Sequence, residues 1–390
     1  MALLVGVVKE TMPGERRVAL TPRVAEGLVK IGARVTIEEG AGDSAGYPDS
    51  DYSSRGIEVQ SRAAVLDHAD VLAQVRTLGA NPEAGRGDLD FLRRGQILIG
   101  LAEPLTAKTE IADLSSRGVT LFALELVPRI TRAQSMDVLS SMGSLAGYKA
   151  VLMAASVLPK MLPMMTTAAG TISPAKVLVI GAGVAGLQAI ATARRLGAVV
   201  FGYDIRAAAR EQVESLGAKF VVLEDVAAAG AEDKGGYAKA MGDDFYRRQQ
   251  AALAAVIREM DIVVTTAAVP GKKAPVLVPA EAIEGMAPGS VILDLAAERG
   301  GNCALTRPGE TVLRHGVQIL GPMNVPSMVP YHASQMFATN LAAFLKPLLN
   351  KGELAIPWND EIVRETAVLK NGEVVNPRVA ELMGMPAELA

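Results

Sequence analysis

Short apolar runs alternate along this chain with longer segments in which apolar residues recur at helical spacing. This alternation is typical of β–α–β units, which build parallel sheets covered by helices. The apolar runs form two successive series of expected buried strands, at residues 3–8, 34–38, 71–75, 96–101 and 120–124, and then at 177–180, 199–203, 220–223, 262–266, 291–295 and 318–320. The pattern therefore predicts an α/β fold with two doubly wound domains.

Two longer helical patterns, at about residues 135–161 and 334–349, interrupt the alternation. If both helices cross between the domains, the last residues return to the first domain and the second domain is an insertion. We therefore predict a discontinuous first domain, residues 1–135 plus 330–390, and a second domain, residues 140–325, with a cleft between them. In such open sheets a ligand is expected at the carboxyl ends of the strands.

Composition excludes several classes of protein. The 390 residues are 50% hydrophobic and 21% charged, which suits a large buried core rather than a disordered chain. Lysine and arginine (39) nearly balance aspartate and glutamate (42), so no basic excess points to nucleic acid. A single cysteine, Cys303, and three scattered histidines predict neither disulfides nor a metal site. No continuous apolar stretch of about 20 residues predicts membrane insertion.

A glycine-rich turn follows the first strand of the second series. Gly181, Gly183 and Gly186 form a GxGxxG pattern, with Val184 at the start of the following helix. The glycines allow a tight turn, a close approach of backbone to a pyrophosphate, and close packing of helix on strand. The next strand ends at Asp204, at the distance expected for a carboxylate that binds a ribose diol. We therefore predict a Rossmann-like dinucleotide site.

Asp204 also bears on the choice of cofactor. A carboxylate at this position repels a 2′-phosphate, which favours NAD over NADP. Arg206 complicates this interpretation, because an arginine can pair with that phosphate. We expect Arg206 to be a solvated residue over the adenine, and the cofactor to be NAD.

A polar loop precedes the first long helical pattern. Gln134, Asp137 and Ser140 are spaced by three residues, so they can point one way, toward the expected cleft. Alternatively, the segment is an ordinary helix start, in which Ser135 caps the helix or Asp137 lies against its dipole. Composition alone favours the ordinary helix start.

Arg129, Gln134 and Asp137 resemble the RQD loop of the NAD(H)-binding component of proton-translocating nicotinamide nucleotide transhydrogenases. The similarity extends over essentially the whole chain, through the segments 9–10, 15–22, 181–186, 265–275, 294–301 and 321–326. Alanine dehydrogenases share several of these segments. The RQD loop and the segment 235–241, which resembles a mobile loop of the transhydrogenase family, distinguish the two.

The resemblance implies roles for individual residues. Asp137 would orient the NAD(H) carboxamide with help from Ser140, Arg129 would hold the loop and cofactor, and Gln134 would reach toward a second nicotinamide. Tyr237 would lie on a lid near the adenosine. The implied cofactor contacts also include Val184 and Ala267, in the segments 181–186 and 265–275.

The resemblance also implies the reaction and the partners. Hydride would pass directly between NADH held here and NADP(H) held on a partner subunit, since only one good GxGxxG turn is present. The chain ends without a spanning segment, so we expect a separate soluble subunit. We expect a homodimer in the cytoplasm, attached peripherally to the inner membrane through membrane-spanning and NADP(H)-binding subunits.

Two other functions remain open. Alanine dehydrogenases need a histidine and a lysine in the cleft, because making or hydrolysing an imine requires proton transfers. Here Arg76 stands where the lysine is expected, and residues 100–103 lack the histidine. Arginine does not release a proton at physiological pH, which disfavours amino-acid dehydrogenation. The third possibility is a catalytically silent NAD(H) sensor that regulates a partner.

Overall fold

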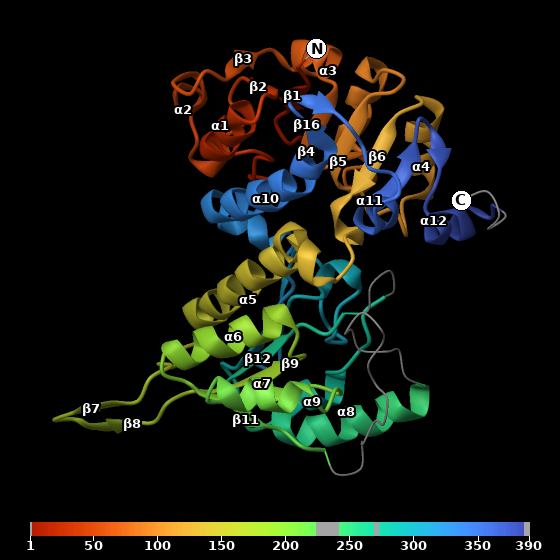
Figure 1. The fold of residues 1–390 in the computed structure, drawn as a ribbon. Helices are drawn as coiled ribbons and strands as arrows, with labels where there is room; N and C mark the ends of the chain where they lie inside the picture. The colour runs from red at the N-terminus through yellow and green to blue at the C-terminus, as the bar shows by residue number, and fades with distance from the viewer. Residues whose placement is uncertain (1, 224–241, 269–272, 386–390) are drawn as a thin grey trace. The chain divides into compact units, whose positions relative to one another are not determined.

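The computed structural model describes residues 2–223, 242–268 and 273–385 (Figure 1). The chain divides into two compact units, Met1–Met142 with Ser327–Ala390, and Gly143–Pro326. The first boundary falls within the long helix α5 (Val138–Val157). The second falls next to the short 3₁₀ segment η7 (Val325–Met328).

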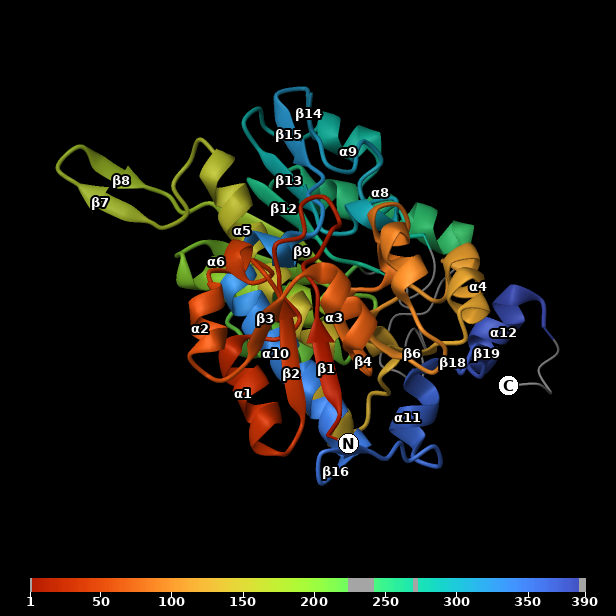
Figure 2. The ribbon, with the colours of Figure 1, turned by 90° about the horizontal axis from the view of Figure 1, so that it is seen from above.

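The first unit contains a sheet whose described strands follow the order β19-β18-β6-β5-β4-β1-β2-β3. The strands are β1 (Leu4–Val7), β2 (Arg34–Glu38), β3 (Glu58–Gln60), β4 (Val71–Arg76), β5 (Ile97–Leu101), β6 (Thr120–Ala123), β18 (Ala367–Lys370) and β19 (Glu373–Val374). Strands β1 to β6 are parallel, and Figure 2 shows β1 and β2 side by side. β18 adds to β6 antiparallel, so the C-terminal part of the chain extends this sheet.

Helices accompany this sheet along the chain. They are α1 (Pro22–Lys30), α2 (Asp49–Ser53), α3 (Arg62–His68), α4 (Lys108–Ser116), α10 (Pro330–Leu345), α11 (Glu361–Thr366) and α12 (Pro377–Met383). α1 shows why these segments fold as they do. Pro22 occupies its first turn, where a missing N–H costs nothing, and Pro22, Ala25 and Leu28 form its buried face.

The second unit contains a sheet of the order β11-β10-β9-β12-β13-β15-β14. Its strands are β9 (Lys176–Ile180), β10 (Val199–Tyr203), β11 (Lys219–Phe220), β12 (Ile262–Thr265), β13 (Val291–Asp294), β14 (Thr311–Arg314) and β15 (Val317–Leu320). Only β14 pairs antiparallel among these described strands. Its helices are α6 (Val184–Arg195), α7 (Ala209–Ser215), α8 (Asp243–Ile257) and α9 (Ala280–Glu284).

Both sheets are doubly wound, which confirms the predicted fold class. In each, the first strand lies in the middle, the next two follow on one side, and the later parallel strands follow on the other. The order reverses between β1 and β4 in the first sheet and between β9 and β12 in the second. A crevice at the carboxyl ends of the strands is expected at such reversals.

Several elements differ from the sequence expectation. The strands β3, β14, β18 and β19 carried no clear apolar run, and the strand expected at 220–223 is only Lys219–Phe220. α5 was expected from 135 to 161 but ends at Val157, because Pro159 follows closely and cannot continue a helix. α10 begins at Pro330 rather than 334 and ends before Pro347.

Two segments of the second unit stand out on its surface. β7 (Met165–Thr167) and β8 (Gly170–Ile172) form a fully exposed hairpin that projects from this unit in Figure 1. α5 packs closely on α6, since a Cβ on Gly147 would lie 2.0 Å from the carbonyl oxygen of Ala185. Among the described helices, α5 is also the one long and apolar enough to cross a membrane, a test that buried helices of soluble proteins pass too.

Candidate nucleotide site

The three glycines between β9 and α6 have different structural reasons. Gly181 has a φ of 97°, and a Cβ there would lie 2.7 Å from Thr266 Oγ1. A Cβ on Gly186 would lie 1.8 Å from the carbonyl oxygen of Gly181. Gly183 has an ordinary φ of −77°, and nothing lies within 4 Å of a Cβ built on it. Packing therefore requires Gly181 and Gly186, whereas the space at Gly183 is open for a ligand.

Asp204 follows β10 and is tied to this turn. Its Oδ2 atom accepts a hydrogen bond of 2.7 Å from the backbone N–H of Ala182. The side chain is only 6% exposed. The predicted carboxylate therefore lies against the glycine-rich turn, where a ribose attached to a bound pyrophosphate would be held.

Arg206 is not the solvated residue that we expected from the sequence. Its Nε and Nη2 atoms donate to the two carboxylate oxygens of Asp204, each at 2.9 Å, and its backbone N–H donates to Oδ1 at 2.8 Å. The two residues are close along the chain, so the planar guanidinium reaches the carboxylate with both donors. The expectation failed because a local bidentate pair is available.

Thr266 and Ala267 follow β12, the strand across the reversal from β9. Thr266 Oγ1 donates to the carbonyl oxygen of Gly181 at 2.9 Å. A Cβ on Gly181 would lie 3.1 Å from the backbone nitrogen of Ala267. Val184 is the first residue of α6 and is 38% exposed, so the free N–H groups of this helix start lie beside the same turn.

The RQD segment lies in the first unit. Gln134 is exposed in the 3₁₀ segment η5 (Thr131–Met136), Asp137 follows it, and Ser140 lies in the first turn of α5. The Asp137 carboxylate accepts the backbone N–H of Ser140 at 2.9 Å and the Ser140 hydroxyl at 2.6 Å. Gln134, Asp137 and Ser140 do not share one helix face, as their spacing had indicated. Asp137 instead caps a helix that begins after it.

Two side chains distant in sequence hold this segment. Arg132 donates from both terminal nitrogens to Asp360, at 2.7 and 2.8 Å. Asn340 donates to the carbonyl oxygen of Ser135 at 2.8 Å. Sequence reasoning missed both contacts, because their partners lie more than 200 residues apart and no local pattern links them.

The remaining predicted residues are placed as follows. Arg129 is exposed and lies just before η5. Tyr237 and the segment around it lie outside the described residues. The structure thus gathers Gly181, Gly183 and Asp204 around one turn in the second unit, and Asp137 with Ser140 at one helix start in the first.

The reversal between β1 and β4 in the first sheet is filled by charged side chains of the chain itself. Glu15 is fully buried, and it binds Arg17 at 2.6 Å and Arg76 at 3.0 Å. Burial opposes its charge, but hydrogen bonding to Arg17 and the two positive charges hold the pKa of Glu15 well below its usual range. Glu10 accepts the backbone N–H groups of Val75 and Arg76. Burial and the neighbouring Glu15 raise the pKa of Glu10 to about 8.

Positions that would carry an acid–base pair in an alanine dehydrogenase lie side by side at the ends of β4 and β5. Arg76 is in register with Leu101, and its Nε donates to Glu15. The three histidines lie elsewhere, at the end of α3 (His68), between β14 and β15 (His315) and in α10 (His332). Arg76 is therefore engaged in an ion pair, with no histidine beside it.

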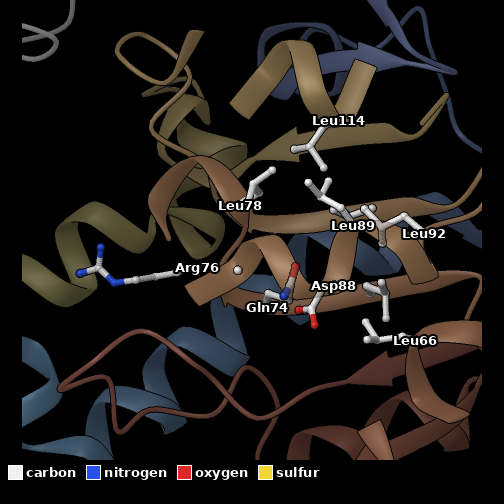
Figure 3. A pocket seen from close by; sticks show the side chains of 11 residues that line it. Leu66, Gln74, Arg76, Leu78, Asp88, Leu89, Leu92 and Leu114 are labelled. Carbon is white, nitrogen blue, oxygen red and sulfur yellow. The ribbon is translucent and has the colours of Figure 1, made fainter. Parts of the chain in front are cut away.

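A cavity next to Arg76 does not supply a substrate pocket. It has a volume of about 20 Å³, which suits about one water molecule. Figure 3 shows that Arg76 points away from the leucines that line most of the cavity. Its polar lining comes from Gln74 and from Asp88, which is held by Arg62 at 2.6 Å.

Glu125 begins the approach to the RQD segment. Its Oε1 atom accepts the backbone N–H groups of Ala102 at 2.8 Å and Glu103 at 2.6 Å. Its Oε2 atom is buried and accepts no hydrogen bond within the described stretches of the chain. Burial raises the pKa of Glu125 from 4.5 to about 7. This carboxyl is therefore a candidate proton-binding group of the first unit.

Glu125→Gln is expected to change how stability depends on pH. Because the pKa of Glu125 is higher in the folded chain, its contribution is complete below about pH 4.5 and is lost as pH rises through about 7. The difference corresponds to about 3 kcal/mol. The amide oxygen of glutamine can accept both N–H groups and stays neutral, so the variant should gain stability relative to the parent between pH 5 and pH 8.

Urea unfolding at both pH values tests this expectation. Glu58→Gln, at an exposed ion pair with Arg34, is the matched control and should show no such trend. A stability difference between Glu125→Gln and the parent that stays constant over this range would contradict it.

Comparison with known proteins identifies the family. The N-terminal domain of the alanine dehydrogenase/PNT family matches residues 6–146, and its C-terminal domain matches residues 150–377. The chain belongs to the alanine dehydrogenase/PNT family. Its two matched domains together cover both doubly wound sheets.

Relatives of two kinds occur in this family. The chain is 47% identical over 376 residues to the first segment of the NAD(P) transhydrogenase alpha subunit of Rhodospirillum rubrum, covering 96% of this chain and 98% of that protein. The crystal structure of transhydrogenase from Sinorhizobium meliloti matches with a TM-score of 0.85 at 44% identity, covering 95% and 100% of the two chains. Alanine dehydrogenase of Bacillus subtilis is 29% identical over 404 residues, covering 100% and 97%. The predicted resemblance to the transhydrogenase component is confirmed.

Proposed function

We propose that this chain is the NAD(H)-binding subunit of a proton-translocating transhydrogenase, which exchanges hydride with NADP(H) held on a partner subunit. The observation that carries the proposal is the state of Arg76, which is paired with the buried Glu15 where an amino-acid dehydrogenase needs a group that exchanges protons. Hydride transfer between two nicotinamides needs no such group. The similarity to transhydrogenase subunits supports the same assignment.

The nucleotide would bind at the turn after β9. Its pyrophosphate would lie over Gly183 and the free N–H groups at the start of α6, beside Ala267. Its adenosine ribose would hydrogen-bond to Asp204. Arg206 now fills acceptor positions of that carboxylate, so binding of the ribose diol requires some of these bonds to be exchanged. The carboxylate favours NAD(H) over NADP(H).

Gly183→Ala tests this seat. The backbone at Gly183 is ordinary and a Cβ meets no atom, so the variant should keep the stability of the parent within about 0.5 kcal/mol. The added methyl group would occupy the space of the pyrophosphate, so the dissociation constant for NADH should rise at least about tenfold. Fluorescence titration with NADH and thermal unfolding measure the two effects. Equal NADH affinity in the variant and the parent would contradict the site.

The nicotinamide would be held by the RQD segment. A carboxylate offers about four acceptor positions, and Asp137 uses two of them on Ser140. The others can accept the carboxamide N–H₂ of NAD(H), with Ser140 beside it. Exposed Gln134 would reach the nicotinamide of the partner's NADP(H), and Arg129 would hold loop and cofactor. Tyr237, which lies outside the described residues, would cover the adenosine.

The chain would act as a homodimer in the cytoplasm, attached to the inner membrane through a membrane-spanning partner and an NADP(H)-binding partner. The β7–β8 hairpin supports a dimer. Two strands alone are marginally stable in water, and this hairpin exposes Met164, Met165 and Ile172. A second copy that covers these side chains would stabilise it. The mass of the chain in solution tests the expected dimer.

Reconstitution tests the function as a whole. The purified chain should bind NADH, and should transfer hydride to an NADP⁺ analogue only after NADP(H)-binding partner domains are added. The alternative, an alanine dehydrogenase, is suggested by the relative from Bacillus subtilis. Reduction of NAD⁺ by the isolated chain with L-alanine, releasing ammonium, would overturn the proposal in favour of that enzyme.

A further inference from the structure

A buried asparagine in the second unit spans the start and end of the loop that follows β12. Asn302 is fully buried, and its amide nitrogen donates to the carbonyl oxygens of Ala267 and Pro275, both at 2.8 Å. Its Oδ1 atom is also buried and accepts no hydrogen bond within the described residues. The orientation of this side chain is therefore set by what it donates to the two carbonyls.

Ala267 belongs to the wall of the nucleotide crevice. It follows β12, and its backbone nitrogen lies beside Gly181 of the glycine-rich turn. Thr266 donates to the carbonyl oxygen of that same glycine. A shift of the peptide at Ala267 would therefore be transmitted to the turn on which the pyrophosphate is expected.

Asn302 is itself fixed by a buried carboxylate at the end of β13. Asp294 is fully buried. Its two oxygens accept hydrogen bonds from Thr265 Oγ1, Ala296 N, Asn302 N, Cys303 N and Thr306 Oγ1, at 2.7 to 3.0 Å. The loop after β13 thus winds around one carboxylate and presents Asn302 toward the end of β12.

The backbone of Asn302 reinforces the far end of the same loop. Its carbonyl oxygen accepts the N–H groups of Leu277 at 2.7 Å and Val278 at 2.9 Å. Ala274 donates to the carbonyl oxygen of Arg299 at 2.8 Å. Both ends of the loop are therefore attached to the segment that Asp294 organises.

We propose that Asn302 is a positioning residue for dinucleotide binding, which holds the peptide at Ala267 in the place where it completes the wall of the crevice. The residue acts through this peptide and not by touching the reacting atoms. The inference rests on the proposed nucleotide site and adds to it a residue that none of the recognised motifs contains.

Two variants test the role. Asn302→Ala removes both donors, and Asn302→Asp removes them while keeping the shape of the side chain, in case the smaller residue impairs folding. Each should raise the dissociation constant for NADH about tenfold, because two buried carbonyls lose their partner. Each should also accelerate tryptic cleavage after the exposed Lys273, which lies in the same loop.

Gln96→Ala is the matched control. Gln96 is equally buried, at 3% exposure, and its amide nitrogen donates to two carbonyl oxygens, of Leu66 and Ala69, both at 2.8 Å. It lies in the first unit, away from this loop. The control should lose thermal stability to a similar degree, yet keep the parent's NADH affinity and its rate of cleavage after Lys273.

The outcomes separate the two proposals. If the unaltered chain binds NADH and both Asn302 variants bind it as tightly as Gln96→Ala, the positioning role is overturned and the nucleotide site stands. If the unaltered chain binds no NADH, both are overturned. Weakened binding in the Asn302 variants alone, with faster cleavage after Lys273, supports the role.

Discussion

Asp137→Asn is expected to slow hydride transfer between NADH and an NADP⁺ analogue by about 10- to 100-fold in the reconstituted complex. Its affinity for NADH should change much less, within about threefold, because pyrophosphate and ribose are held in the second unit. Single-turnover transfer and fluorescence titration measure the two quantities separately.

The reason lies in what asparagine retains. Asparagine is as good an N-terminal helix cap as aspartate, so its side-chain oxygen can still accept the backbone N–H of Ser140 and α5 should still begin at Val138. The variant loses the negative charge and the second acceptor oxygen, which now binds the Ser140 hydroxyl. A carboxamide would then be oriented less tightly, and small errors in the approach of two nicotinamides cost rate steeply.

A control and a competing function complete this test. Ser61→Asn changes the residue that caps α3, whose hydroxyl accepts the N–H of Ala64, and it should leave transfer unchanged. A catalytically silent NAD(H) sensor predicts a different result for Asp137→Asn. It would show full regulation of the partner and no loss that could be assigned to hydride transfer.

Local patterns predicted the features of this chain whose causes are local. The glycine spacing between β9 and α6 reflects contacts within a few residues, such as Gly186 against Gly181. The apolar runs at 97–101 and 120–123 are buried because parallel strands are covered on both faces. These features suffice for the fold class, which the structure confirms.

Contacts between distant segments could not be predicted in the same way. β18 joins β6 across more than 240 residues, and Arg132 meets Asp360 across 228. Asn302 looks like any loop residue until Asp294 and Ala267 are placed beside it. The start of α5 was misplaced because spacing shows helical periodicity but not which residue caps it. The roles assigned to Arg129, Gln134 and Asp137 stay predictions.

Glu15→Gln is expected to lower the free energy of unfolding by about 3–5 kcal/mol at neutral pH. Glu15 is the carboxylate shared by Arg17 and Arg76, whose side chains are 2% and 12% exposed. Without its charge, two guanidinium groups remain where water cannot solvate them fully. The change leaves shape and volume almost untouched, so the loss would measure charge compensation.

The pH dependence of this loss has a definite sign. The pKa of Glu15 is lower in the folded chain than its ordinary value of 4.5, so its stabilising contribution is present above about pH 4.5 and disappears as pH falls toward the lowered pKa. The stability difference between Glu15→Gln and the parent should therefore be full at pH 7 and shrink at acidic pH. Burial of Glu125 gives the opposite trend, which separates the two groups.

Urea unfolding followed by tryptophan fluorescence can measure this loss in the correct unit. The single tryptophan, Trp358, stacks on Phe122 in the first unit, at 5.9 Å between ring centroids, so its emission reports on that unit. Glu58→Gln removes an exposed carboxylate 3.4 Å from Arg34 and should cost less than about 1 kcal/mol. A loss at Glu15 no larger than this would show that the two arginines do not depend on it, and that the reversal between β1 and β4 can accept another anion.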